Sequence, residues 1–375
     1  MTRAPLSTSS FERQLPGVSW IPILGAALLI FAVFMSFMEI RLVTLGYHPT
    51  ILDSQASWMK ERARASRLGE RALILIGASR IQLGIDLDVL REKTGLEPVQ
   101  LAIDGSASTP ILEGLAADQT IRGTILVDYY DHNVGSHDGA APTFQKNYEK
   151  NKHARVALPL GRTSENSLSQ MLHESFRVYA DGANPLFTLL TRIIPAERSR
   201  QYLVTYLDRS RTADYSLVKL PEFYHQRVIR NLGLEKSLSP ASKNLNTILP
   251  QEINKLMPLD NRDFMLKTQA TKQLVEAIKA RGGQVIFVAM PSSGMVRDIE
   301  ERRYPRSRFW DYFTENIGVP AVHSAYSPAL KDFTCPDGSH LDVKDRARFT
   351  GVLADVLEPI LQKQAPNKDY AASRR

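Results

Sequence analysis

The chain has 375 residues, of which 43% are hydrophobic, so it can bury a large core and a disordered chain is not expected. Its formal net charge of +7 suits anionic partners such as membrane headgroups or acidic glycans, but we find no clustered nucleic-acid motif and expect no nucleic-acid partner. The single cysteine, Cys335, excludes an intramolecular disulfide and a cysteine-rich metal site, and we expect no cofactor and no metal.

An uncharged apolar run occupies residues 18–38, "VSWIPILGAALLIFAVFMSFM". About 20 apolar residues are needed for a helix to cross ~30 Å of hydrocarbon. The run is longer than the core of a signal peptide and no small-x-small cleavage site follows it, which favours an uncleaved anchor over a removed signal peptide. We therefore expect an N-terminal segment at 1–17 and a transmembrane anchor at 18–40.

The positive charges beside this run indicate its orientation. Arg3 and Arg13 precede it, against Glu12, whereas Arg41 alone follows it closely. Because positively charged flanks tend to stay in the cytoplasm, we expect a cytoplasmic N-terminus. The protein would then cross a bacterial inner (cytoplasmic) membrane once, with its main domain periplasmic or extracellular.

After a connector with a charged amphipathic helix around Trp58 (41–71), short runs rich in Val, Ile and Leu alternate with helical patterns. This alternation of strand and helix patterns is typical of the α/β fold class, a parallel sheet covered by helices, because parallel strands need crossover connections. The expected strands are 72–77, 99–104, 124–130, 284–290 and 319–324, and the expected helices include 86–96, 262–283 and 342–363.

A long basic segment, 136–261, separates the third and fourth expected strands. It far exceeds an ordinary connection, so we expect an insertion or cap, mostly helical, rather than a loop. The main domain would then comprise 72–135 and 262–364, followed by a disordered tail at 365–375.

Polar residues follow the expected strands at the edge where open parallel sheets bind ligands. Ser79 follows the first strand, Gly105 the second and Asn133 the third. Late in the chain, "PDGSHLD" carries Asp337 and His340 three residues apart on a turn. A nucleophilic serine needs an imidazole to accept its proton and a carboxylate to orient the imidazole, and these two residues can supply both groups.

The α/β-hydrolase elbow does not fit, because Ile81 stands where that motif requires glycine. Instead, "GASRIQLG" (77–84), "DGS" (104–106) and "PDGSHLD" (336–342) resemble, in order, blocks of the SGNH (GDSL-type) hydrolase family. The resemblance spans 72–135 and 262–360. It implies a flavodoxin-like three-layer sandwich with a five-stranded parallel sheet.

The same resemblance implies roles for single residues. Ser79 would be the nucleophile, His340 the general base and Asp337 the acid that orients it. The backbone N–H groups of Ser79 and Gly105 and the Asn133 side chain would form an oxyanion hole, whose donors contribute a few kcal/mol each.

The N-terminal anchor, the "GASR" block and "YPRSRFWDYF" (304–313) resemble the membrane-anchored members associated with O-acylation of cell-surface polysaccharides. This implies a serine O-acyltransferase or esterase, acetyl being the expected group, with a polysaccharide or other acylated glycan as substrate and a membrane-bound O-acyltransferase as partner. Ala78 replaces the family's usual Asp, and "YYDHN" (129–133) replaces its Gly-x-Asn-Asp block. An alternative is therefore a non-catalytic subunit that binds polysaccharide or such an acyltransferase.

Three side chains also have plainer interpretations. Ser79 is a candidate N-cap of the helix that follows it. His132 is a competing candidate for a base or a metal ligand, although no second ligand stands at a suitable spacing. Arg80 is expected to pair with an acidic side chain rather than to contact a substrate.

Overall fold

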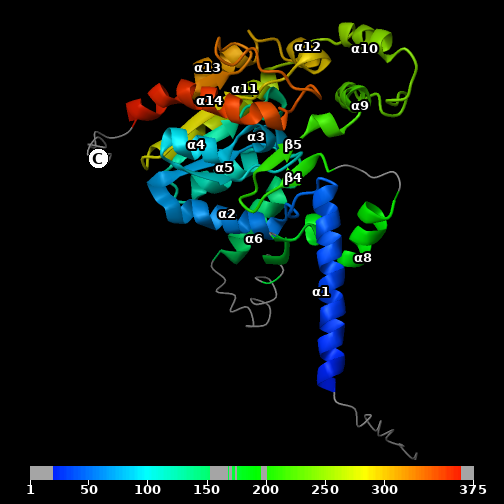
Figure 1. Cartoon of the computed structure of the whole chain (residues 1–375). Coiled ribbons are helices and arrows are strands. Elements are labelled where there is room, and N and C mark those ends of the chain that lie inside the picture. The colour runs from blue at the N-terminus through cyan, green and yellow to red at the C-terminus, as the bar shows by residue number, and fades with distance from the viewer. Residues whose placement is uncertain (1–19, 153–167, 169–170, 174, 196–200, 365–375) are drawn as a thin grey trace, which may run out of the picture.

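The computed structural model describes residues 20–152, 168, 171–173, 175–195 and 201–364 (Figure 1). The expected cytoplasmic segment 1–17 and the expected disordered tail 365–375 lie outside the described residues.

The predicted α/β fold with a five-stranded parallel sheet is confirmed. The strand order is β2-β1-β3-β6-β7 and every pairing is parallel. The strands are β1 (Ala72–Ile76), β2 (Glu97–Gln100), β3 (Thr124–Asp128), β6 (Gln284–Ala289) and β7 (Ala321–His323). β2 starts two residues earlier than expected and includes Pro98, which an edge strand tolerates because one side of its backbone is unpaired.

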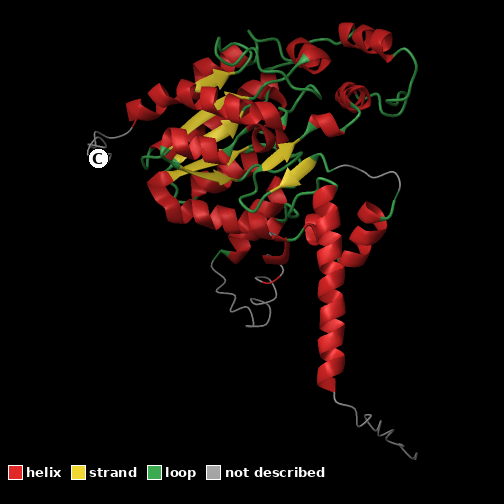
Figure 2. Cartoon of the chain, viewed as in Figure 1, coloured by secondary structure: helices red, strands yellow, loops and turns green. Residues whose placement is uncertain are grey.

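Helices cover both faces of the sheet, which lies among them in Figure 2. Along β1, Ala72, Ile74 and Ile76 pack on one face, and Leu73 and Leu75 pack on the other. This is why the strand reads as a continuous apolar run rather than an alternating one. The first face packs against α2 (Gln55–Leu68), α5 (Thr109–Ala117), α6 (Ala141–Asn151), α11 (Arg262–Lys279) and α13 (Trp310–Ile317), and the second against α3 (Ser79–Gly84), α4 (Leu87–Thr94) and α14 (Val343–Gln364).

Local signals explain where the helices begin and end. The Asp86 side chain accepts hydrogen bonds from the backbone N–H groups of Asp88 and Val89 and so caps α4, which ends at the left-handed Gly95. Trp58 on α2 is fully buried, and its Nε1 donates to the carbonyl of Leu101 at 2.9 Å. The connector helix is thereby fastened to the edge of the sheet.

The segment 136–261 contacts the rest of the chain in several places. Helix α6 packs against α2 and α5, whereas η3 (Arg177–Gly182) and η4 (Leu189–Ile193) pack against the N-terminal apolar helix. The hairpin of β4 (Leu203–Thr205) and β5 (Arg211–Ala213) lies against α3. Its extent as a separate cap stays a prediction. The remaining elements are η1 (Gly69–Arg71), η2 (Asp131–Asn133), α8 (Pro185–Thr188), η5 (Tyr215–Leu217), α9 (Leu220–Leu232), α10 (Leu245–Asn254) and α12 (Gly294–Arg303).

The N-terminal apolar helix α1 (Trp20–Thr44) projects away from the folded domain (Figure 1). It has 25 residues and is long and apolar enough to cross a membrane. Its apolar side chains are mostly exposed, with Ile21 at 82% and Ile30 at 69%, unlike those of a core helix. The segment predicted to be an anchor is therefore a helix long and apolar enough to span a membrane, and the helix continues four residues beyond the predicted end.

Candidate functional site

A turn that begins with Gly77 holds Ser79 at the carboxyl end of β1. Gly77 has a φ of +150°, and a Cβ on it would lie 2.3 Å from the Cβ of Asp128, so only glycine fits. Ser79 is the first residue of α3, and the N-cap is Ala78, which makes no side-chain capping bond. The interpretation of Ser79 as an N-cap is therefore wrong, and its side chain is available for another role.

Ser79, His340 and Asp337 form one hydrogen-bonded chain. His340 Nε2 lies 2.8 Å from Ser79 Oγ, and His340 Nδ1 lies 2.8 Å from Asp337 Oδ2. A carboxylate only accepts, so Nδ1–H donates to Asp337 and Nε2 is left to accept the Ser79 hydroxyl proton. Asp337 and His340 are buried and Ser79 is half-buried, so the serine is the most accessible of the three.

The turn after Pro336 fixes Asp337 and His340 relative to each other. Asp337 Oδ1 accepts the backbone N–H of Ser339 at 2.9 Å and that of His340 at 2.8 Å. Gly338 has a φ of +85°, and a Cβ there would lie 2.4 Å from the Cγ2 of Val296 on α12. The other carboxylate oxygen is therefore aimed at the imidazole by the backbone itself.

Two residues of the 136–261 segment also contact Asp337. Arg227, on α9, places Nη2 2.9 Å from Asp337 Oδ2. Tyr215, in η5, lies beside the same carboxylate, and burial together with the charge of Asp337 raises the pKa of the Tyr215 hydroxyl. Sequence reasoning missed both, and no local signal could have found them, since "HQRVIR" (225–230) reads as ordinary amphipathic helix.

The neighbours of this carboxylate set its charge and that of the imidazole. Burial opposes ionisation of Asp337, but the hydrogen bond from His340 and the charge of Arg227 outweigh it, and the pKa of Asp337 lies well below its usual range. Burial lowers the pKa of His340, which the bond to Asp337 only partly offsets. His340 is thus neutral at pH 7, the form in which it can accept a proton.

A second buried carboxylate supports the turn from behind. Asp128, the last residue of β3, lies against Gly77 and near the backbone N–H groups of Ala78 and Ile81 at the start of α3, which favour its charged form. Burial raises the pKa of Asp128 to about 7, against the effect of the nearby Arg80 charge. A charged residue at a strand end was a signal that could have marked Asp128.

Arg80 contacts an acidic and an aromatic side chain. Its guanidinium pairs with Glu300 on α12 and lies 4.6 Å from the centre of the Tyr130 ring. The expectation that Arg80 pairs with an acidic side chain is confirmed. The pair joins α3 to α12 beside the site.

The other predicted site residues lie at the same edge of the sheet. Beyond β2 the chain still pairs with β1, since Ile103 N–H donates to the carbonyl of Gly77 at 3.0 Å. The exposed turn that contains Gly105 therefore runs beside the Ser79 turn. Its role in an oxyanion hole stays a prediction.

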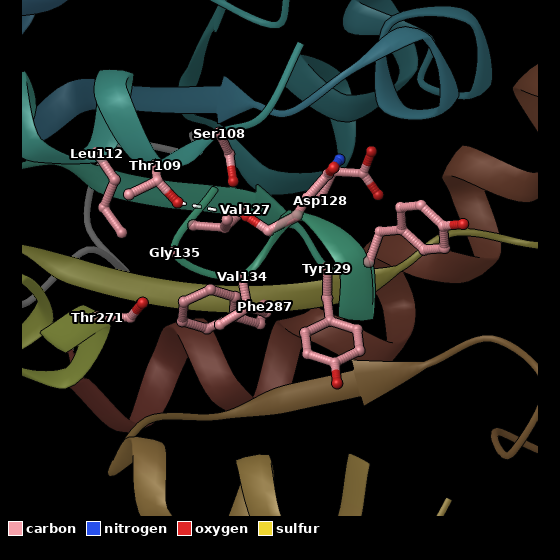
Figure 3. Close-up of a pocket in the computed structure, with 12 residues that line it drawn as sticks. Ser108, Thr109, Leu112, Val127, Asp128, Tyr129, Val134, Gly135, Thr271 and Phe287 are labelled. Atoms are coloured by element: carbon pink, nitrogen blue, oxygen red, sulfur yellow. Dashed lines mark hydrogen bonds between the residues drawn. The ribbon is translucent and has the colours of Figure 1, made fainter. Parts of the chain in front are cut away.

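Asn133 ends η2 and is half-buried. It lines a small pocket whose residues include Thr109, Val127 and Phe287, and neither Ser79 nor His340 lines that pocket (Figure 3). The Asn133 backbone carbonyl accepts the Thr109 hydroxyl at 3.3 Å. Its place in an oxyanion hole also stays a prediction.

His132, the competing candidate, is exposed, and its Nε2 lies 3.7 Å from Asp138 Oδ2. Among the residues that the structure describes, no three His, Cys, Asp or Glu side chains are grouped to hold a metal ion.

Comparisons of the chain with protein-family models, with curated proteins and with solved structures find no match, so the geometry of the site carries the functional argument.

Proposed function

We propose that the protein is a membrane-anchored serine O-acyltransferase or esterase that acts on a cell-envelope or extracellular polysaccharide through an acyl-enzyme. The observation that carries this proposal is the chain of hydrogen bonds from Ser79 through His340 to Asp337 at the carboxyl edge of the sheet. Three side chains from two distant segments meet with their polar atoms 2.8 Å apart, in the order that nucleophilic catalysis needs.

The first half-reaction would transfer the acyl group to the enzyme. Ser79 Oγ attacks the carbonyl carbon of an acyl ester while its proton passes to His340 Nε2. The C–O bond to the leaving group then breaks, and the protonated His340 returns the proton to the departing oxygen. Asp337 stays ionised throughout and stabilises the imidazolium, in agreement with its lowered pKa.

The second half-reaction would remove the acyl group from Ser79. A sugar hydroxyl or a water molecule gives its proton to His340 and attacks the acyl carbon, and Ser79 leaves with the proton restored. With a sugar hydroxyl the protein is a transferase, and with water it is an esterase. In both halves the developing oxyanion would be held by the N–H groups of Ser79 and Gly105 and by the Asn133 amide, as the family resemblance implies.

The sheet supports the wider assignment. Its order, β2-β1-β3-β6-β7, has the same connectivity as flavodoxin-like sheets, and helices pack on both of its faces. We therefore propose the flavodoxin-like three-layer sandwich of SGNH hydrolases for residues 72–135 and 262–364.

Location and partners follow from α1. As a single-pass anchor in a bacterial inner membrane, with the main domain periplasmic or extracellular, it would hold the site beside the envelope glycans. A membrane-bound O-acyltransferase in the same membrane would supply the acyl group to Ser79, and acetyl is the group that we propose.

A serine-directed fluorophosphonate tests the proposal without knowledge of the natural substrate. An activated Ser79 displaces fluoride from phosphorus and gains a stable adduct, which intact-protein mass spectrometry detects and peptide mapping locates. We expect one adduct, on Ser79, and hydrolysis of a chromogenic acetyl ester that Ser79→Ala abolishes. Ser237→Ala, at an exposed serine beyond the end of α9, is the matched control. Unlabelled wild-type protein with no esterase activity would instead favour the non-catalytic subunit.

A further inference from the structure

We propose that α8 and η4, with Ile194 behind them, form a second membrane contact that lies in the headgroup region of the same bilayer as α1. The outward face of this segment, which we call the α8–η4 face, is apolar and exposed. Exposure is 65% for Leu186, 52% for Phe187, 56% for Leu190 and 60% for Ile194.

Helical spacing gathers these four side chains on one side. They are separated by one, three and four residues, so they form a stripe along the segment. The opposite side is buried, since Thr188 and Ile193 are covered and Ile193 packs with Met38 and Leu42 of α1. The exposed apolar side chains of this segment therefore indicate a contact with a second apolar environment, in addition to the contact with α1.

Thr191 and Arg192, the polar side chains between Leu190 and Ile193, both have partners within the structure. The Thr191 hydroxyl donates to the carbonyl of Phe187 at 2.8 Å. Arg192 pairs with Asp181 at 3.0 Å, and its guanidinium lies 5.5 Å from the centre of the Tyr47 ring. The exposed side chains between Pro185 and Ile194 therefore bring no charge to the α8–η4 face.

Contacts with α1 set the depth of the face. The residues of α1 that pack against η3 and η4 run from Met35 to Leu42. At 1.5 Å per residue they begin about 22 Å and end about 33 Å along the helix from Trp20. The hydrocarbon core is ~30 Å thick, so the α8–η4 face lies at the boundary between hydrocarbon and headgroups on the Thr44 side. Figure 1 shows α8 beside the C-terminal half of α1.

An ion pair between α1 and η3 holds the segment at this level of α1. Glu39 accepts the Arg177 side chain at 2.9 Å and the backbone N–H groups of Arg177 and Val178 at 3.0 and 3.3 Å. The start of η3 is thereby fastened to α1 at the point where its uncharged run ends. A lipid surface is the partner that this placement favours, because the bilayer that receives α1 is already at that level.

Depth-dependent fluorescence quenching tests the inference, which rests on the proposed anchor. The full chain with Cys335→Ser, which removes the one native thiol, receives Leu190→Cys and an environment-sensitive fluorophore. It is then placed in phosphatidylcholine nanodiscs that contain lipids spin-labelled near the headgroup or near the bilayer centre. Met257→Cys, at a residue that is 77% exposed near α10, is the matched control, and Val33→Cys reports on α1 itself.

We expect the label at 190 to emit at shorter wavelength than the label at 257 and to be quenched more strongly by the shallow spin label than by the deep one. A label at 190 that behaves as the one at 257 does, while the label at 33 is quenched, would overturn the inference and leave the anchor intact. Absence of quenching at 33 would remove the anchor as well. Protection of position 190 in native membranes but not in nanodiscs would mean a protein partner and would also overturn the inference. The quenching does not depend on acyl transfer, so its result is separate from the test of Ser79.

Discussion

Asp337→Asn is the sharpest perturbation of the site, because it changes charge and proton placement while it preserves shape. In the wild type, Oδ1 accepts two backbone N–H groups, and Oδ2 faces the His340 Nδ1–H and Arg227. The remaining oxygen of the amide can still serve the two backbone donors. Its NH2 group then stands where Oδ2 stood, and donors face donors.

The imidazole can relieve this conflict only by moving its proton from Nδ1 to Nε2. His340 would then donate to Ser79 and could no longer accept its proton. A wrong tautomer of this kind costs about 10⁴ in turnover, or about 5 kcal/mol of transition-state stabilisation. Loss of the ion pair with the partly exposed Arg227 adds a structural cost of about 1 kcal/mol.

Two measurements check these values. Turnover of a chromogenic acetyl ester should fall about 10⁴-fold, whereas thermal unfolding should show only the smaller structural loss. Asp342→Asn is the matched control, since Asp342 is also buried in this segment but caps α14 through the backbone N–H of Lys344. Turnover of Asp337→Asn within tenfold of the wild type, or an equal loss in the control, would refute the proposed role of Asp337.

Three further predictions concern the neighbours of this site. Arg227→Met removes a positive charge that lowers the pKa of His340, so the acidic limb of the pH–rate profile should move to higher pH. Arg227→Lys keeps the charge and should leave this limb nearly in place. An acidic limb that does not move in Arg227→Met would contradict the effect of Arg227 on His340. Gly77→Ala should lower the free energy of unfolding by more than about 1 kcal/mol, because the new Cβ would collide with Asp128 and the φ of this residue is positive. Gly351→Ala should be neutral or stabilising, since the nearest atom to its new Cβ is 4.0 Å away. Equal effects of the two substitutions would contradict the close approach of Gly77 to Asp128. The pKa of Asp128 is about 7 in the folded protein and 3.8 in its ordinary environment, so the folded protein binds this proton more tightly and loses stability as pH rises from 3.8 to 7. Denaturant titrations should therefore show that Asp128→Asn gains stability relative to the wild type as pH rises over this range. A difference that does not change with pH would argue against the raised pKa.

The sheet and the contact between Asp337 and His340 could be predicted from the sequence because their signals are local. Each strand is a short apolar run, and parallel strands bring their carboxyl ends to one edge. Asp337 and His340 stand on one turn, so their mutual contact follows from spacing alone. That this turn lies near Ser79 was predicted from the edge that parallel strands share and from the resemblance to the SGNH family.

The support for the site could not be predicted, because it depends on how the 136–261 segment folds back. Arg227 and Tyr215 reach Asp337 only because β4, β5 and α9 lie against α3 and α12. One buried side chain holds that hairpin, since Arg209 donates to Asp53 and to the carbonyls of Gln100 and Ala102. The residues around Arg209 do not indicate these partners, because the partners lie more than 100 residues away in sequence.

Formation of an acyl-enzyme on Ser79 is the most direct test of the central claim. The full-length protein is mixed with an activated acetyl ester, quenched in acid to preserve the ester bond, and weighed by intact-protein mass spectrometry with peptide mapping. We predict one acetyl group on Ser79 in the wild type and none in Ser79→Ala. Acetylation absent from Ser79 in the wild type, or equally present in Ser79→Ala, would contradict it.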